Sequence, residues 1–226
     1  MVSHASHVIR RNAATVAVVP LALMFCAVVA PSSWAIDVKL SMDEAKKALA
    51  AGREPMDKAN TEDEVKKVMQ HASMATRVGA DPEKDACGTS AILRTKRFWL
   101  ESFGRKEATE SKKQKSDVRM PDDKIQKYLD MPNLEVEVQL CGDDEYFAEG
   151  AKVTMQQKGK NIEPVDVGQA ERGRKLELAD KSTAYRSRFT ARFAYDAFDP
   201  NAKTKFLVTQ QDGKMSEFDA DLSKVK

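Results

Sequence analysis

Arginine is the residue type whose spacing in this chain most directly predicts chemistry. Within residues 183–198, Arg186, Arg188 and Arg192 alternate with aromatic and small residues, which places the three guanidinium groups on one face of a β-strand. A guanidinium group can donate two parallel hydrogen bonds to a carboxylate or a phosphate. The three arginines are therefore a candidate binding strip for an acidic ligand or a protein partner. The simpler interpretation is that Glu or Asp side chains on neighbouring strands pair with them.

Few side chains could serve as a catalytic base or as a soft metal ligand. The whole chain has three histidines and three cysteines, of which only His71, Cys87 and Cys141 lie beyond residue 35. His71 falls in a predicted helix, where a partly exposed structural histidine is the simpler interpretation. One histidine and two cysteines make no convincing zinc or copper site, and the chain has no glycine-rich phosphate loop. We therefore expect no catalytic residue, no metal and no cofactor.

Acidic residues leave two weaker alternatives. Carboxylates at 143–145 and at 196–199 fall in predicted loops, where oxygen ligands could hold calcium. Two carboxyl groups held across a sugar cleft could also hydrolyse a glycan. Neither alternative has a defined motif in this sequence, and acidic residues in turns usually serve solvation and local hydrogen bonding.

The first 35 residues predict an export signal. Arg10 and Arg11 precede an apolar run over 13–30, and Ser33 and Ala35 are the small residues expected before a cleavage site. We expect residues 1–35 to be removed, leaving a periplasmic or secreted protein without a stable membrane span. Retention of the apolar run as an anchor is the alternative.

Removal of the signal also changes the charge balance. The signal holds two of the 37 basic residues and none of the 35 acidic ones, so the remaining chain has no net charge. A neutral chain has no global field that would draw it to nucleic acid. We therefore expect no nucleic-acid partner, although local charged patches can still bind.

The two cysteines beyond the signal predict a disulfide. Cys87 and Cys141 have no C-x-x-C spacing that would make a redox pair, and export would bring them into an oxidising compartment. A bridge between cysteines 54 residues apart would stabilise the fold by about 4 kcal/mol, because it lowers the conformational entropy of the unfolded chain.

The first part of the chain predicts helices. Ser41 and Thr61 are each followed three positions later by glutamate, the spacing of a capping box at a helix start. We expect the first helix to end near Gly52 and the second near Arg77.

Residues 90–95 predict a short strand that leads into a longer helix, in which Trp99, Leu100 and Phe103 share one face. Pro121 then opens a further short helix, with Ile125, Tyr128 and Leu129 as its buried stripe.

The hydrophobic period changes from about 3.6 to 2 at Leu134. Leu134, Val136, Val138 and Leu140 alternate with charged or polar residues, which predicts a half-buried strand. Further strands are predicted over 151–157, 161–167, 175–179, 183–195, 203–210 and 215–221.

These patterns predict an α+β protein. An α-rich region over 36–133 would pack with a C-terminal immunoglobulin-like antiparallel β-sandwich over 134–226. We expect an exported, non-enzymatic envelope protein with a structural or protein-interaction role and an unidentified protein partner. Binding of an acidic small molecule or glycan is the alternative, and carboxylate-dependent glycan hydrolysis is a weaker one.

Overall fold

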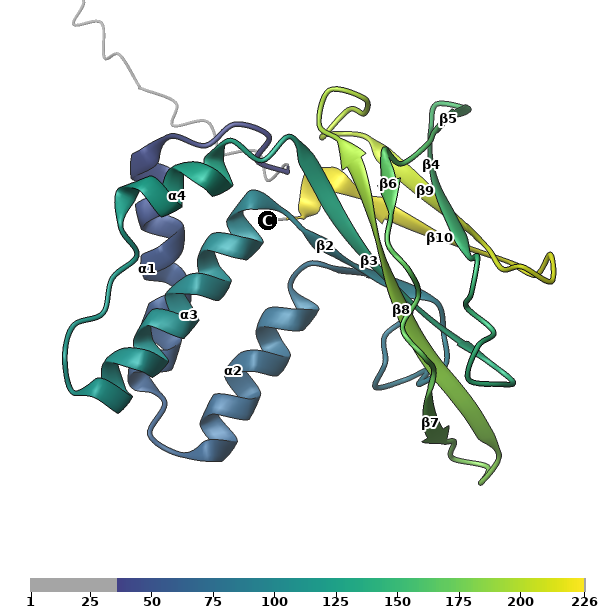
Figure 1. The fold of residues 1–226 in the computed structure, drawn as a ribbon, viewed down its shortest axis with the longest axis horizontal. Coiled ribbons are helices and arrows are strands. Elements are labelled where there is room, and N and C mark those ends of the chain that lie inside the picture. The colour runs from purple at the N-terminus through teal and green to yellow at the C-terminus, as the bar shows by residue number, and fades with distance from the viewer. Residues whose placement is uncertain (1–35, 226) are drawn as a thin grey trace, which may run out of the picture. The chain divides into compact units, whose positions relative to one another are not determined.

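The computed structural model describes residues 36–225 as an α+β fold, shown in Figure 1. Its helices are α1 (Met42–Lys58), α2 (Glu62–Met74), α3 (Lys96–Gln114) and α4 (Asp122–Leu129), with a final 3-10 turn η1 (Leu222–Lys224). Its strands are β1 (Arg77–Gly79), β2 (Ser90–Arg94), β3 (Asn133–Gly142), β4 (Lys152–Gln157), β5 (Lys160–Ile162), β6 (Asp166–Val167), β7 (Arg174–Glu177), β8 (Thr183–Ala194), β9 (Lys203–Thr209) and β10 (Met215–Asp221). Within residues 36–225, none of the helices has the length and apolar character needed to cross a bilayer.

Both predicted capping boxes are confirmed. The Ser41 hydroxyl accepts a hydrogen bond from the Glu44 N–H at 3.3 Å, and the Glu44 carboxylate accepts one from the Ser41 N–H at 2.8 Å. Thr61 and Glu64 form the same reciprocal pair at the start of α2. Each box satisfies amide groups that have no partner within the helix.

The predicted ends of these two helices are wrong. Gly52 does not end α1, which continues through Pro55 to Lys58. A Cβ added to Gly52 would lie 2.0 Å from the Glu101 backbone oxygen, and one added to Gly104 would lie 1.9 Å from the Leu49 oxygen. The two glycines therefore let the backbones of α1 and α3 approach closely.

The second helix also ends earlier than predicted. α2 stops at Met74 instead of near Arg77, because Arg77 is the first residue of β1 and pairs with Ile92 of β2. The last residue of the expected helix therefore belongs to a strand. The local sequence pattern could not predict the pairing of that strand.

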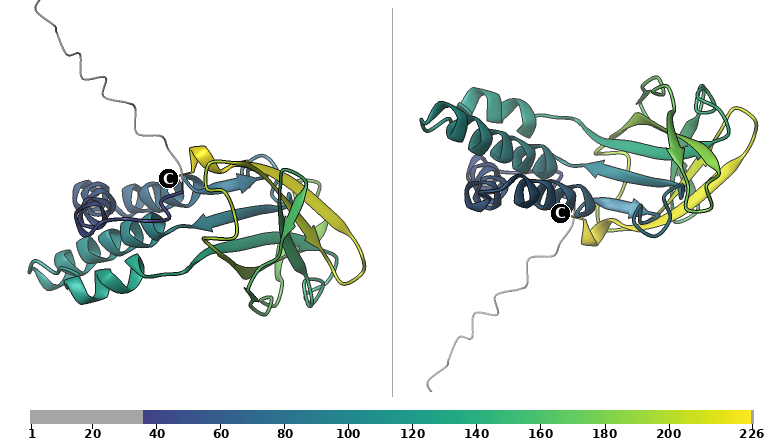
Figure 2. Two further views of the ribbon diagram at one scale, coloured as in Figure 1. Left: turned by 90° about the horizontal axis from the view of Figure 1, so that it is seen from above. Right: turned by 90° about the horizontal axis from the view of Figure 1, so that it is seen from below.

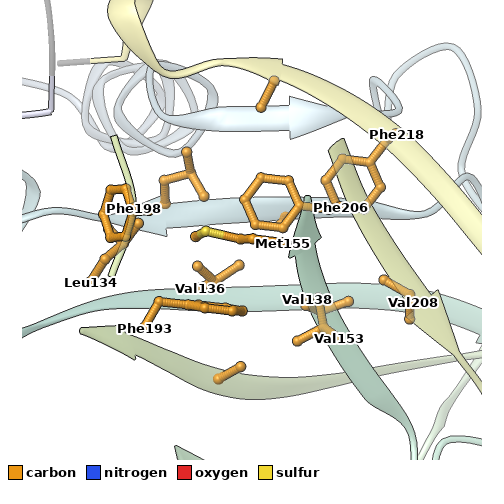
Figure 3. Packing of buried hydrophobic residues seen from close by; sticks show 14 of the residues in the cluster. Leu134, Val136, Val138, Val153, Met155, Phe193, Phe198, Phe206, Val208 and Phe218 are labelled. Carbon is orange, nitrogen blue, oxygen red and sulfur yellow. The ribbon is translucent and has the colours of Figure 1, made fainter. Parts of the chain in front are cut away.

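Two antiparallel sheets enclose the main core. The six-stranded sheet has the order β1-β2-β3-β8-β6, with β7 also paired to β8, and the four-stranded sheet has the order β10-β9-β4-β5. In Figure 3, Val136, Val138 and Phe193 of the first sheet meet Met155 and Phe206 of the second. The alternation predicted for β3 is confirmed, because its even-numbered residues from 134 to 140 are buried.

The helices form a second layer of packing at one end of the two sheets, as Figure 2 shows from above and below. Their smaller core consists of residues from α1, α3 and α4, namely Ala45, Ala48, Leu49, Leu100 and Ile125. The chain leaves this layer after α2 through β1 and returns to it after β2 at the start of α3.

The first sheet crosses the boundary that the sequence analysis placed at residue 133. β1 and β2 come from the segment expected to be α-rich, yet β2 pairs with β3 at the centre of the six-stranded sheet. The single strand expected over 161–167 is divided: β5 joins the four-stranded sheet and β6 the six-stranded one. Pro164 lies between them and lacks the N–H that a continuous ladder would need.

The predicted disulfide is present between Cys87 and Cys141, whose Cα atoms are 5.3 Å apart. It joins the loop that precedes β2 to the end of β3. The loop's Ala86 carbonyl is thereby held beside the outward face of the six-stranded sheet, where it accepts a hydrogen bond from Arg186.

Candidate functional site

The outward face of the six-stranded sheet carries the polar groups predicted as a binding strip. In the antiparallel register of β3 and β8, Glu135 lies opposite Arg192, Gln139 opposite Arg188 and Cys141 opposite Arg186. Because successive side chains of a strand alternate between faces, the apolar residues between these positions fill the core. The prediction that the three arginines share one face is confirmed.

Arg192 at one end of this face is neutralised. Its Nε lies 3.0 Å from Glu135 Oε1, and its Nη1 lies 2.6 Å from Asp166 Oδ2 on β6. The hydrogen bond to Glu135, followed by the charge of that carboxylate, raises the pKa of Arg192 above its usual value. This arginine is part of a cross-strand ion-pair network, in which Glu135 and Asp166 compensate its charge.

Arg188 in the middle of the face is also paired. Its Nε lies 2.8 Å from Glu171 Oε1, and its Nη1 lies 3.9 Å from Glu137 Oε2. The hydrogen bond to Glu171 is the main reason that the pKa of Arg188 is raised. Glu137 is 4% exposed and also accepts a hydrogen bond from Arg94 of β2, whose guanidinium lies 5.4 Å from the Trp99 ring centroid.

Arg77 extends the polar face to the edge strand β1. Its Nη1 donates to Ser90 Oγ at 2.7 Å and to Gln139 Oε1 at 3.0 Å. Burial lowers the pKa of Arg77; the charge of Glu137 opposes that change, and the charge of Arg186 adds to it. The guanidinium groups of Arg77 and Arg186 are therefore close enough to repel each other.

The other end of the face is cationic. Arg174 of β7 lies directly opposite Arg186 of β8 in the strand register. Arg186 donates to the Ala86 carbonyl, and within residues 36–225 neither arginine has an ion pair with a carboxylate. Like charges placed directly opposite each other across two strands destabilise a sheet.

A hollow of about 340 Å³ opens beside this arginine pair. Its lining is mostly polar and comes from β3, β7, β8 and the segment before β7: Gln139, Glu171, Arg174, Lys175, Leu176, Arg186, Ser187 and Arg188. Three guanidinium groups and an amide thus line one open surface, together with the Glu171 carboxylate that pairs with Arg188. Such a surface can hydrogen-bond to carboxylate or phosphate oxygens.

The sequence analysis found Arg186, Arg188 and Arg192 but missed Arg174 and Arg77. Arg174 lies one residue before the strand predicted over 175–179, so a correct register for the hairpin of β7 and β8 would have placed it opposite Arg186. Arg77 was assigned to the end of a helix. No local signal in the sequence distinguishes the two arginines that have carboxylate partners from the one that does not.

The remaining candidates from the sequence lie apart from this face. His71 is exposed on α2. In the two acidic loops, Asp144 accepts a hydrogen bond from the Tyr146 N–H, Glu145 pairs with Arg172, and Asp199 accepts one from the Asn201 N–H. In the part of the chain that the structure describes, no three His, Cys, Asp or Glu side chains are grouped closely enough to hold a metal ion.

Comparisons with known proteins place the chain in no family. No protein-family model and no curated protein matches it. Among solved structures it is similar to an IgNAR antibody domain C1, at 8% sequence identity and a TM-score of 0.26, over 46% of this chain and 84% of that domain. We draw no argument from this likeness.

Proposed function

We propose that this protein is an exported, non-enzymatic recognition protein that binds an acidic segment of a partner protein. The binding surface is the cationic end of the six-stranded sheet, which we define as Arg77, Arg174 and Arg186. The uncompensated cross-strand pair of Arg174 and Arg186 is the observation that carries the proposal. The disulfide is compatible with an extracellular or periplasmic location, which the export signal predicts.

The arginine pair is costly unless something acidic binds to it. Cross-strand pairs contribute up to about 1 kcal/mol, and like charges act in the unfavourable direction. The other two arginines of the predicted strip, Arg188 and Arg192, each lie beside carboxylates. A carboxylate from a partner would convert the repulsion between Arg174 and Arg186 into a bridged pair of charge-assisted hydrogen bonds.

The polar lining of this surface favours a protein segment over a small molecule. Sites for small molecules usually enclose most of the ligand's surface and are lined mainly by apolar groups. The hollow beside Arg186 is open to solvent and mainly polar, and it continues along the edge strand β7 to the exposed Lys175. An extended acidic peptide could contact that whole length.

Two packed antiparallel sheets also support the immunoglobulin-like sandwich that the sequence predicts, and we include that architecture in the proposal. Sandwich domains offer sheet faces and strand edges as recognition surfaces. We assign no catalytic role to His71 or to the acidic loops.

The test compares arginines that have carboxylate partners with arginines that do not. Binding of a labelled peptide of Asp and Glu residues is measured for Arg174→Gln, Arg186→Gln, Arg188→Gln and Arg192→Gln, which all change the net charge equally. We expect about a tenfold loss of affinity for each of the first two, from one charge-assisted hydrogen bond of about 1.5 kcal/mol. The last two should change affinity by less than threefold. Equal effects in all four variants would show only general charge attraction and would refute the proposed site.

A second experiment tests whether this surface contacts a protein partner in the native host. A photo-crosslinking residue in place of Leu176, which lines the hollow, should capture a protein with an acidic segment, and Arg174→Gln should reduce that capture. A crosslinked species that is insensitive to Arg174→Gln would place the partner elsewhere.

The alternative is that this hollow binds a small acidic molecule, and it has a test of its own. A free dicarboxylate or an acidic glycan would raise the melting temperature in a saturable way, whereas a peptide-binding surface would respond little to such ligands. Saturable stabilisation by one such ligand, lost in Arg186→Gln, would replace the protein-partner proposal with the ligand-binding one.

A further inference from the structure

A second hollow, of about 470 Å³, lies in the helical layer and shares no residue with the sheet face described above. It runs between α3 and α4, and residues of the segment that joins them also line it. The side chains at its base are largely apolar, and we call them the floor of the groove: Phe103, Val118, Met120, Pro121 and Tyr128. Its volume falls within the range of about 300–1,000 Å³ typical of small-molecule sites.

The floor is held in place by buried hydrogen bonds. Glu107 is 7% exposed and its Oε1 accepts the Met120 N–H at 2.6 Å. The Val118 N–H donates to Ser111 Oγ at 2.9 Å, and the Val118 carbonyl accepts from Arg53 Nη1 at 3.0 Å. The segment after α3 is thus fixed to both long helices, and the groove exists before any ligand arrives.

Aromatic packing shapes the middle of the groove. The ring centroids of Phe103 and Tyr128 are 4.7 Å apart, with the rings tilted by 52°. Both side chains are partly exposed. They pack against the small helical core but leave apolar surface open to the groove.

The rim of the groove is cationic. Lys106 of α3 and Lys124 and Lys127 of α4 line it, and across residues 36–225 no ion pair or hydrogen bond neutralises any of the three. Two other charged groups of the rim form ion pairs with neighbouring side chains: Arg119 with Asp117 at 3.0 Å, and Glu110 with Lys113 at 3.3 Å.

We propose that this groove binds a medium-chain fatty acid. An apolar chain would cover the floor, and the carboxylate would lie among Lys106, Lys124 and Lys127. Burial of apolar surface supplies the affinity, while the lysines select a ligand with a negative head over a neutral one. The charge of the rim excludes a basic or purely apolar segment as the preferred occupant.

Binding is tested with dodecanoate, kept below its micelle concentration, on the purified protein by titration calorimetry. We expect saturable binding of one molecule per chain. Affinity should rise by about two- to fourfold for each methylene from octanoate to dodecanoate, because each buried methylene adds a fixed increment. Dodecanol and acetate should each bind at least tenfold more weakly, since each lacks one of the two features.

Variants separate the groove from general charge attraction. K124Q together with K127Q should weaken dodecanoate binding at least tenfold, because both lysines lie on the rim. K66Q together with K67Q, a matched pair of substitutions on α2, should change it less than twofold. Both pairs replace exposed side chains, so far-UV circular dichroism should stay that of the wild type.

Several results would overturn the assignment. No saturable binding of dodecanoate, or equal weakening in the two double variants, would remove the groove as a fatty-acid site. Binding to vesicles of anionic phospholipid without binding of dodecanoate would identify a membrane surface instead. An acidic peptide that binds here, with dodecanoate inactive, would identify a protein partner. Arg174→Gln should leave dodecanoate binding unchanged, so this result and the test of the sheet face can fail separately.

Discussion

Glu137 provides the sharpest test of how the polar face of the six-stranded sheet is stabilised. Its side chain is 6% exposed and lies between Arg94, which is 24% exposed, and Arg188, which is 43% exposed. Glu137→Gln would keep the shape of the side chain but remove the charge. Removing one partner of a buried ion pair costs about 3–5 kcal/mol, and a hydrogen bond to a charged group is worth about 1.5–3 kcal/mol. Because water can reach both arginines, we expect a loss of about 2–3 kcal/mol.

Glu171→Gln is the matched control for this change. Glu171 also pairs with Arg188, but its side chain is 48% exposed, and exposed ion pairs contribute about 0–1 kcal/mol. Urea unfolding with the disulfide intact should therefore separate the two variants by at least 1 kcal/mol. Equal free energies of unfolding would refute the view that burial makes Glu137 the central stabilising group.

The same two variants connect stability to binding. Each removes one negative charge from the face that we propose binds an acidic segment. An acidic peptide should therefore bind both variants more tightly and by similar factors, although only Glu137→Gln loses stability. A peptide affinity that followed stability instead of charge would place the binding surface elsewhere.

Three further predictions concern other parts of the fold. Gly104→Ala should lower the free energy of unfolding by about 1–3 kcal/mol, because the new Cβ meets the Leu49 carbonyl. Alanine stabilises a helix whose surface is open, so a stabilised variant would contradict the close crossing of α1 and α3. Cys141→Ser should lower the free energy of unfolding by up to about 4 kcal/mol, measured by thermal unfolding. It should also weaken acidic-peptide binding, because the loop that positions Arg186 loosens; unchanged binding would show that the disulfide does not position Arg186 for the peptide. Hydrogen bonds from Ser41, first from its backbone, lower the pKa of Glu44, so this contribution to stability is present above about pH 4.3 and lost on acidification. Ser41→Ala removes the hydroxyl but keeps the backbone N–H that donates to Glu44, so it should flatten that acid limb only in part in pH-dependent unfolding, and an unchanged profile would contradict it.

Local patterns were sufficient to predict the elements that depend on local physics. The capping residues Ser41 and Thr61 mark true helix starts, because the cap bonds lie within one turn. The alternation in β3 and β8 identifies their buried faces, because strand side chains alternate whatever the neighbour is. The pairing of Cys87 with Cys141 was predicted from the expected export and from the lack of another cysteine beyond residue 35.

Features set by neighbours distant in sequence could not be predicted in this way. Gly52 has the sequence context of a helix end, yet it is buried against α3, where only the absence of a Cβ permits the approach. Whether Arg192 or Arg174 has a carboxylate partner depends on the register of β6 and β7 against β8. A register can shift by one residue without changing the composition of a strand, and such a shift reverses which face each side chain occupies.

The absence of net charge beyond residue 35 does not make the surface of this protein electrically uniform. The screening length at physiological salt is about 8 Å, so a partner senses the charges of one face and not their sum over the chain. On the sheet face the carboxylates gather around Arg188 and Arg192 and leave Arg174 and Arg186 uncompensated. A chain without net charge can therefore still select an acidic partner at a local cluster of uncompensated arginines. If that reasoning holds, raising the salt concentration should weaken peptide binding to the wild type more steeply than to Arg174→Gln, and parallel salt dependences would contradict it.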